Sequence, residues 1–305
     1  MTPFLALVGP TASGKTEAGI LVAQALGAEI LSIDSMLVYR GMDVGTAKPT
    51  AEHRSRVPHH LLDLVDPNEP FSVAAFQAAA RTAAADVRRR GRRPLLLGGS
   101  GLYFRAVVDD LEFPGTEPAV RRELEREAAA VGAQRLHRRL AGSDPAAAGK
   151  IEPANVRRTV RALEVASITG RPFSSFAGDW DEYPAERVRV AGIRIPGEIL
   201  RARIEDRVRR MLEAGWLEEV RRLLDAGFGG WLTATQAIGY VELARHLGDE
   251  MALEAAVDRV VVRTRALARR QVAWFRRDPR IRWFDAGEEG ASVVAGEVAA
   301  YLGAA

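Results

Sequence analysis

The sequence predicts an α/β protein: a P-loop NTPase-like parallel sheet core flanked by helices, with an all-helical insertion domain. Three observations indicate this fold. Short apolar runs alternate with helical stretches, a glycine-rich loop follows the first run, and one long region is helical throughout. Parallel strands need a crossover connection, usually a helix, so this alternation favours a parallel sheet.

The first part of the core contains three predicted strands, over residues 4–8, 29–33 and 94–97. A helix over 17–26 that ends at Gly27 connects the first two strands. A second helix precedes the third strand, with Ser72 as its expected N-cap and Gly91 as its end.

The helical insertion is expected at residues 113–186, between the core segments 1–112 and 187–305. Proline and glycine residues break the chain at its start, and helical patterning then continues to Thr169 without a strand-like run. The polar stretch 178–186 is expected to be an irregular hinge that returns the chain to the core.

The second part of the core resumes the alternation. Strands are predicted over 188–195, which Pro196 closes, and over 281–284. Between them, one apolar helical face is formed by Leu200, Ile204, Val208 and Met211. Further helices are predicted around 217–224, over the basic stretch 251–277 and over 291–302.

Composition excludes several classes of protein. The chain has no cysteine, which excludes a disulfide framework and a cysteine-ligated zinc site. No run reaches the roughly 18 apolar residues of a membrane span, and no basic segment precedes the first apolar run as in a signal peptide. We therefore expect a cytoplasmic protein without membrane contact, and, because no apolar heptad is present, a monomer.

Charge is unevenly distributed along the chain. Only 3 of the 43 basic residues are lysines, an arginine excess that codon usage explains. Residues 260–282 contain eight arginines and one acid, and residues 119–161 contain ten basic and five acidic residues. Two basic zones in a nearly neutral chain indicate a polyanionic partner, although a solvated helix face is an equal alternative for any single arginine.

A phosphate-binding loop follows the first predicted strand. It consists of Gly9, Pro10, Thr11, Ala12, Ser13, Gly14, Lys15 and Thr16, which match G-x-x-x-x-G-K-[ST] in full. In this motif backbone N–H groups point at an anion, the lysine adds a mobile charge and the final hydroxyl ligates Mg²⁺. The loop predicts a substrate with a pyrophosphate or polyphosphate group.

The acid that normally accompanies this loop in an NTPase is missing. The third predicted strand runs into Gly98, Gly99 and Ser100, whereas an acid, Asp34, follows the second strand. Asp34 is placed to meet a second substrate, with a helix cap or turn former as the alternative. The adjacent His59 and His60 favour a structural role, because adjacent histidines without a further ligand rarely chelate a metal.

The segment 34–49 resembles the signature of the bacterial tRNA dimethylallyltransferase (tRNA isopentenyltransferase, IPP transferase) family. The resemblance extends in order along nearly the whole chain. Its further segments are 58–63, 66–67, 98–103, 161–165, 203–207, 236–240 and 269–275.

This resemblance implies transfer of the dimethylallyl group from dimethylallyl diphosphate to N6 of the adenine at tRNA position 37, next to the anticodon. The loop 9–16 then holds the diphosphate, with Mg²⁺ as cofactor on Thr16. Asp34 resembles the general base of the family and Arg207 stabilises the departing diphosphate, while Ser100 stands where the family usually has threonine and keeps the hydroxyl.

The resemblance also implies contacts to the anticodon stem-loop of tRNA, with the target adenine flipped out to reach Asp34. Trp274 and Phe275 are expected in the core, with base stacking as the alternative. The implied tRNA-contacting positions are Asp34, Ser35, Met36, Leu37, Gly101, Arg122, Arg157, Arg158, Thr159, Val160, Arg161, Gln236, Ala237, Ile238, Gly239, Tyr240 and Val241.

Two other functions fit a phosphate loop. A P-loop small-molecule kinase needs the missing acid at the end of the third strand. An adenylate isopentenyltransferase, which modifies free nucleotides, needs no large basic insertion. The tRNA-modifying reaction is therefore the preferred interpretation.

Overall fold

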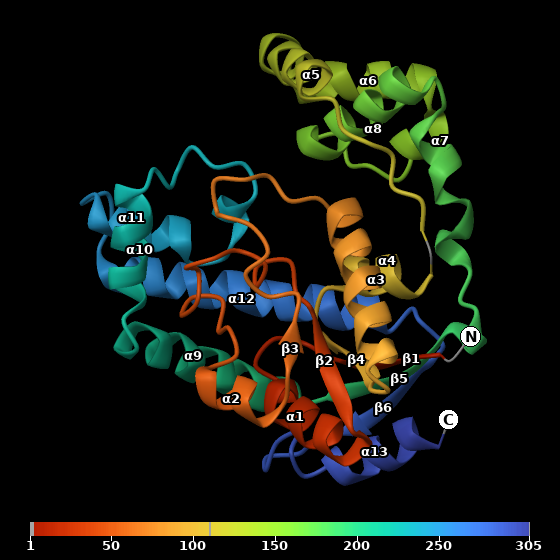
Figure 1. Cartoon of the computed structure of the whole chain (residues 1–305). Helices are drawn as coiled ribbons and strands as arrows, with labels where there is room; N and C mark the ends of the chain where they lie inside the picture. The colour runs from red at the N-terminus through yellow and green to blue at the C-terminus, as the bar shows by residue number, and fades with distance from the viewer. Residues whose placement is uncertain (1–2, 110, 305) are drawn as a thin grey trace. The chain divides into compact units, whose positions relative to one another are not determined.

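The computed structural model describes residues 3–109 and 111–304. Its centre is a parallel six-stranded sheet in the order β3-β2-β4-β1-β5-β6 (Figure 1). The strands are β1 Phe4–Val8, β2 Ala28–Ile33, β3 His59–His60, β4 Arg93–Gly98, β5 Val188–Arg194 and β6 Ile281–Asp285. Val8 of β1 pairs with Gly98 of β4, which in turn pairs with Ile33 of β2, so the loops after these three strands emerge at one edge of the sheet.

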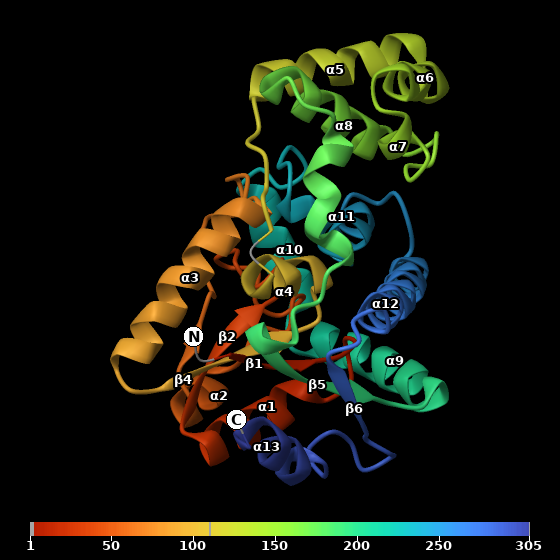
Figure 2. The same cartoon turned by 90° about the vertical axis from the view of Figure 1, so that its right-hand side faces the viewer.

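Helices cover both faces of the sheet. The sheet and these helices form one compact unit, called the α/β unit below. Its helices are α1 Lys15–Leu26, α2 Ala51–Arg56, α3 Val73–Arg89, α4 Gly101–Val108, α9 Gly197–Glu213, α10 Trp216–Asp225, α11 Tyr240–Leu247, α12 Leu253–Phe275 and α13 Ala295–Gly303, with 3₁₀ turns η2 Ala185–Arg187 and η3 Ala234–Gln236. Helices α1 and α13 lie on one side of the sheet and α3, α4 and α12 on the other (Figure 2).

Alternation along β1 divides the core into two layers. Leu5 and Leu7 belong to the cluster with α1 and α13, whereas Ala6 and Val8 belong to the cluster with α3, α4 and α12. Successive side chains of a strand point to opposite faces, so a short run that is apolar at every position is buried on both. This confirms the α/β fold class and the parallel sheet predicted from the sequence.

A second compact unit is all helical. The chain enters it between Val108 and Asp109 and leaves it between Glu182 and Tyr183. Its elements are α5 Pro118–Val131, α6 Ala133–Ser143, α7 Pro145–Ala148, α8 Val156–Thr169 and the 3₁₀ segment η1 Phe173–Asp181. Its own core contains Leu124, Leu136, Leu140, Ile151 and Leu163.

Several local predictions need correction. The stretch 178–186 is not irregular throughout, because 3₁₀ turns η1 and η2 occupy much of it. Helix α13 begins at Ala295 rather than at residue 291. Helix α4 has no apolar stripe to predict it, because all of its residues except Leu102 are buried. In the described ranges, no helix combines the length and the apolar character that a membrane crossing requires.

Candidate active site

A cavity of about 340 Å³ lies within the α/β unit, where the loops after the strands meet helices α9 and α12. Thr11, Lys15 and Thr16 of the phosphate loop line it, as do Asp34 to Leu37 after β2. The other side is formed by Gly45 to Ala47, by α9 at Arg207, by Gln236 to Ile238 and by α12 from Val260 to Gln271. Crevices at the carboxyl ends of strands are the usual ligand sites of open α/β sheets.

The phosphate loop has the backbone conformation of an anion-binding nest. Ala12 and Gly14 have φ angles of 61° and 82°, in the left-handed region. Alternation of left-handed and ordinary residues turns successive N–H groups towards one point. Helix α1 begins directly after Gly14, at Lys15, and adds its positive end. Lys15 itself donates from Nζ to the carbonyl of Pro10 at 3.0 Å.

Three charged side chains of the cavity influence one another. Burial and, second to it, the positive charge of Arg207 lower the pKa of Lys15 to about 8, and the negative charge of Asp34 opposes both. Burial likewise lowers the pKa of Arg207, against the attraction of Asp34. The structure therefore brings together the predicted lysine, arginine and aspartate from α1, α9 and the end of β2.

Asp34 also forms a local turn. Its Oδ1 accepts the backbone N–H of Met36 at 2.9 Å, so the turn-forming alternative describes a contact that the structure contains. The same side chain lines the cavity, and the two roles are compatible because a carboxylate has further lone pairs.

Ser100 lies close to this point in the fold. Its backbone N–H donates to the carbonyl of Ile33 at 3.3 Å, next to Asp34, and its own carbonyl accepts from Phe104 as α4 begins. Ser100 and Gly101 do not themselves line the cavity. Burial, with the charges of Tyr39 and Asp34, raises the pKa of Tyr103, so this hydroxyl stays protonated beside the site.

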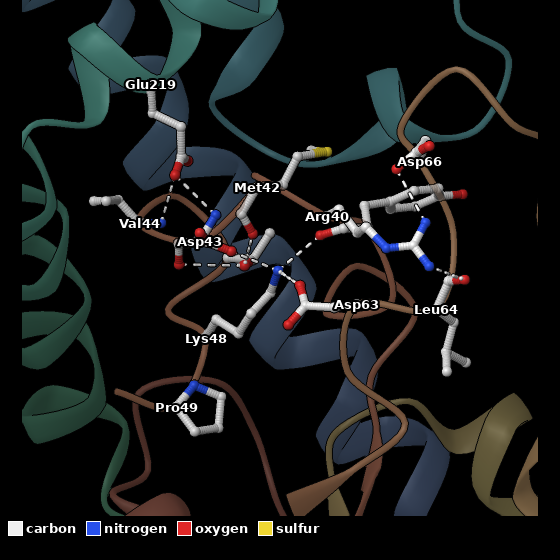
Figure 3. Close-up of polar contacts among 12 residues, drawn as sticks. Arg40, Met42, Asp43, Val44, Lys48, Pro49, Asp63, Leu64, Asp66 and Glu219 are labelled. Carbon is white, nitrogen blue, oxygen red and sulfur yellow. Dashed lines mark hydrogen bonds and ion pairs between the residues drawn. The ribbon is translucent and has the colours of Figure 1, made fainter. Parts of the chain in front are cut away.

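A buried lysine holds the loop that follows Asp34 (Figure 3). The Nζ of Lys48 donates to the carbonyl of Tyr39 at 2.7 Å and to Oδ1 of both Asp43 and Asp63 at 2.6 Å. Only 2% of its side chain is exposed. All three donor positions of the ammonium are used, so Lys48 fixes the segment 39–43 against the segment around Asp63.

Glu219 holds the same loop from the other side. Its carboxylate accepts the backbone N–H groups of Asp43, Val44 and Gly45 at 2.8–3.1 Å and the hydroxyl of Tyr240 at 2.7 Å. Figure 3 shows the carboxylate of Glu219 directed at the turn around Asp43 and Val44. Neither role was predicted: the backbone partners of Glu219 lie more than 170 residues away, and those of Lys48 lie 5 to 15 residues away in a loop without a periodic pattern.

Close packing against the ring of Trp216 requires glycine at two positions near the site. Its ring is fully buried, and a Cβ on Gly45 or on Gly239 would lie 2.0 or 2.1 Å from it. Gly239 also has a φ of 96°, which a side chain rarely adopts. The glycines let the loop at 45 and the start of α11 approach the same indole.

The predicted tRNA-contacting positions differ in accessibility. Gln236, Ala237 and Ile238 line the cavity, while Tyr240 is fully buried and bonded to Glu219. In the helical unit Arg122, Arg157 and Arg158 are exposed, whereas Thr159 and Val160 are buried. Arg161 donates to Glu164 and to the carbonyls of Pro114 and Gly115. The side chains of Thr159, Val160 and Tyr240 are therefore not accessible at the surface.

Part of the basic zone on α12 is neutralised within the protein. Arg263 pairs with Glu242, and Arg265 pairs with Glu205. Arg269, Arg270, Arg276 and Arg277 are exposed. Phe275 is buried in the core, as expected, whereas 36% of Trp274 is exposed and its ring contacts Gly101.

The histidine pair has the structural role expected of it. His59 bonds through Nδ1 to the carbonyl of Val57 and His60 through Nε2 to Glu29, each at 2.7 Å. Within residues 3–109 and 111–304, no cluster of three histidine or acidic side chains is arranged to hold a metal ion.

The fold defines a protein of the P-loop NTPase-like class, and its cavity is lined by the charged side chains of Lys15, Asp34 and Arg207. Residues 37–278 match the family model described as IPP transferase, and residues 3–63 match that of isopentenyl transferase. The chain therefore belongs to the IPP transferase family, which confirms the resemblance seen in its segments.

Relatives of known name agree with this assignment. The chain is 50% identical over 290 residues to a tRNA dimethylallyltransferase of Nocardioides sp., covering 95% of this chain and 93% of that one. It is 47% identical to that of Desulforudis audaxviator, with 95% and 94% covered. The crystal structure of the tRNA isopentenylpyrophosphate transferase of Bacillus halodurans has a TM-score of 0.71 at 39% identity, covering 99% and 97%.

A eukaryotic dimethylallyltransferase acting on tRNA is similar over 93% of this chain and 74% of its own, with a TM-score of 0.77 and 26% identity. This similarity at 26% identity extends the agreement to the fold over 93% of this chain.

Proposed function

We propose that this chain transfers the dimethylallyl group of dimethylallyl diphosphate to N6 of the adenine at position 37 of tRNA and releases diphosphate. It is a prenyltransferase that acts on tRNA, as its relatives are named. The observation that carries the assignment of the site is that Lys15, Arg207 and Asp34 surround one cavity next to a phosphate loop. Neither a kinase nor an adenylate isopentenyltransferase is favoured by these relatives.

The charges fit a substitution at carbon. The bond between the allylic carbon and the phosphate oxygen breaks with its electron pair on oxygen, the bond from N6 to that carbon forms, and N6 loses a proton. Lys15, Arg207 and the amides of the loop stabilise the negative charge that develops on the departing diphosphate. Asp34 accepts the proton, which makes the weakly nucleophilic exocyclic amine a better donor of electrons.

A magnesium ion fits the diphosphate side of the cavity. Mg²⁺ takes few protein ligands and binds mainly to water and substrate phosphates. Thr16 lines the cavity at the start of α1, and in this loop motif the hydroxyl of the final residue supplies such a ligand. When bound there, the ion neutralises charge on the diphosphate; Lys15 and Arg207 do the same from the protein.

The acceptor side fits a flipped base of an anticodon stem-loop. Asp34 to Leu37 and Gln236 to Ile238 line the same cavity as the phosphate loop. We assign them to the adenine and the phosphate loop to the diphosphate. Exposed arginines supply phosphate contacts, namely Arg122, Arg157 and Arg158 in the helical unit and Arg269 and Arg270 on α12. We further propose that the enzyme acts as a monomer in the cytoplasm, which sedimentation and fractionation test.

The test is transfer of label from dimethylallyl diphosphate to an anticodon stem-loop, to AMP, and, separately, phosphoryl transfer from ATP to small alcohols. We expect transfer to the stem-loop only. Asp34→Asn is expected to lower the rate by about 10²–10⁴-fold while tRNA affinity stays unchanged. Asp225→Asn, at an exposed position on α10, is the matched control. Wild-type transfer by Asp34→Asn would show that another group is the base.

A further inference from the structure

The side chain of Gln271 connects helix α12 to the phosphate loop. Its Oε1 accepts the backbone N–H of Thr11 at 2.8 Å, across 260 residues of sequence. Gln271 lies on the same stretch of α12 that lines the cavity. One amide of the loop therefore already has a partner within the protein.

The carboxamide of Gln271 is also confined on its other side. A Cβ on Gly99 would lie 2.4 Å from Nε2 of Gln271 and 3.1 Å from the carbonyl of Gly9. The absence of a side chain at Gly99 is what makes room for the amide group. Gln271 thus fills the space between the phosphate loop and the loop after β4.

The position of Thr11 in the loop gives this contact a consequence. Thr11 is the third residue of the motif, whereas the left-handed residues Ala12 and Gly14 and the start of α1 form the nest for the anion. A longer chain of phosphoryl groups needs a further N–H donor and further space. Gln271 takes the donor at Thr11 and fills the space beside it.

We infer that Gln271 is a specificity-determining residue that restricts the loop to a diphosphate and rejects triphosphates. Nucleoside triphosphates are the ordinary ligands of this motif, so an enzyme that uses a diphosphate donor needs a means to exclude them. A protein discriminates by leaving the wrong ligand without a partner or without room, and Gln271 does both. This inference rests on the proposed role of the loop as the binding site for the diphosphate of the prenyl donor.

The test is calorimetric titration with inorganic pyrophosphate and with tripolyphosphate, each with Mg²⁺, against three variants. The wild-type protein is expected to bind pyrophosphate at least about tenfold more tightly, the size of one lost hydrogen bond to an anion. Gln271→Ala frees the Thr11 amide and the space, so its preference is expected to shrink to within about threefold, mainly through tighter tripolyphosphate binding.

Two further variants test whether a changed preference comes from loss of the Gln271 side chain. Gln271→Glu keeps the size and the acceptor but adds a negative charge. It is therefore expected to weaken the binding of both anions and to keep the preference for pyrophosphate. Gln24→Ala, exposed on α1, is expected to behave as wild type. Pyrophosphate binding by Gln271→Ala shows that the variant is folded.

An unchanged preference in Gln271→Ala, or no preference in the wild-type protein, would overturn the role of Gln271 alone. Failure of the wild-type protein to bind pyrophosphate would instead overturn the assignment of the loop as the donor site, and this inference with it.

Discussion

The ammonium nitrogen of Lys48 lies 2.6 Å from Oδ1 of Asp63, in a contact that leaves only 2% of the lysine side chain exposed. Lysine is rare in this chain, with 3 residues against 40 arginines. A compact ammonium directs three donors from one atom, whereas a planar guanidinium cannot converge on the same three oxygens. Lys48 therefore holds the loop after Asp34 in a way that the otherwise preferred arginine does not reproduce.

Replacement of this lysine is expected to loosen the loop. Lys48→Met removes the donor to Asp43, Asp63 and the carbonyl of Tyr39. Both carboxylates are partly exposed and regain water, so we expect a loss of about 1–3 kcal/mol in the free energy of unfolding. Urea denaturation measures it. Lys150→Met, at an exposed position of the helical unit, is the control, and an equal loss there would contradict the assignment.

Glu219 is expected to act on the acceptor substrate and not on the donor. Glu219→Gln leaves one acceptor oxygen for three backbone N–H groups and a tyrosine hydroxyl, so the loop 43–45 loses its fixed position. We expect KM for tRNA to rise about tenfold, with pyrophosphate affinity unchanged, because the phosphate loop has separate supports. Glu218→Gln, at the exposed neighbouring position, is the control. Loss of pyrophosphate binding would show that Glu219→Gln also disturbs the phosphate loop and not only the loop 43–45.

Gly101 is expected to matter through Trp274. A Cβ at Gly101 would lie 2.0 Å from Cδ1 of that indole. Gly101→Ala is therefore expected to cost about 1–3 kcal/mol by overpacking and to shift the tryptophan fluorescence. Trp274→Ala in the same chain should recover most of this loss in a double-mutant cycle. A loss of stability that persists in the double variant would show that the contact with Trp274 is not its cause.

The helical unit contains a pH-dependent contribution to stability. Burial alone would raise the pKa of Glu164, but the hydrogen bonds from Arg121 and Arg161 outweigh it and lower the pKa below 4.5. A carboxylate with a depressed pKa stabilises the folded state above the unfolded value, and this contribution is lost as pH falls through the folded value.

Glu164→Gln is therefore expected to lower the free energy of unfolding by about 1–3 kcal/mol at pH 7. The difference from wild type should narrow as pH falls below 4.5, where the wild-type carboxylate takes up its proton. Urea denaturation followed at several pH values measures both. A difference that is the same at every pH would show that shape, and not charge, carries the contribution.

Local patterns of apolar and helix-capping residues predicted several elements correctly. Strand β1 was expected over residues 4–8 and forms there, and the side chain of Ser72 accepts from Ala75 as the N-cap of α3. The two-residue strand β3 and helix α4, which is buried at every residue except Leu102, carry no periodic signal. Strand β3 is defined by its pairing with β2 at the edge of the sheet, and α4 by the elements packed around it, and no local window of sequence contains these partners.

The sequence by itself determined the phosphate loop, the acid after β2 and the family, because each depends on residue types at fixed short spacings. Only the tertiary structure decided which side chains support them. Glu219 meets Asp43 across 176 residues and Gln271 meets Thr11 across 260. A buried polar group must find a partner, and the packing of distant elements selects which one, so the roles of Glu219 and Gln271 became visible only when the chain was folded. The partners of Lys48 are near it in sequence, but the path of the loop that brings them to one ammonium was not predictable from a periodic pattern.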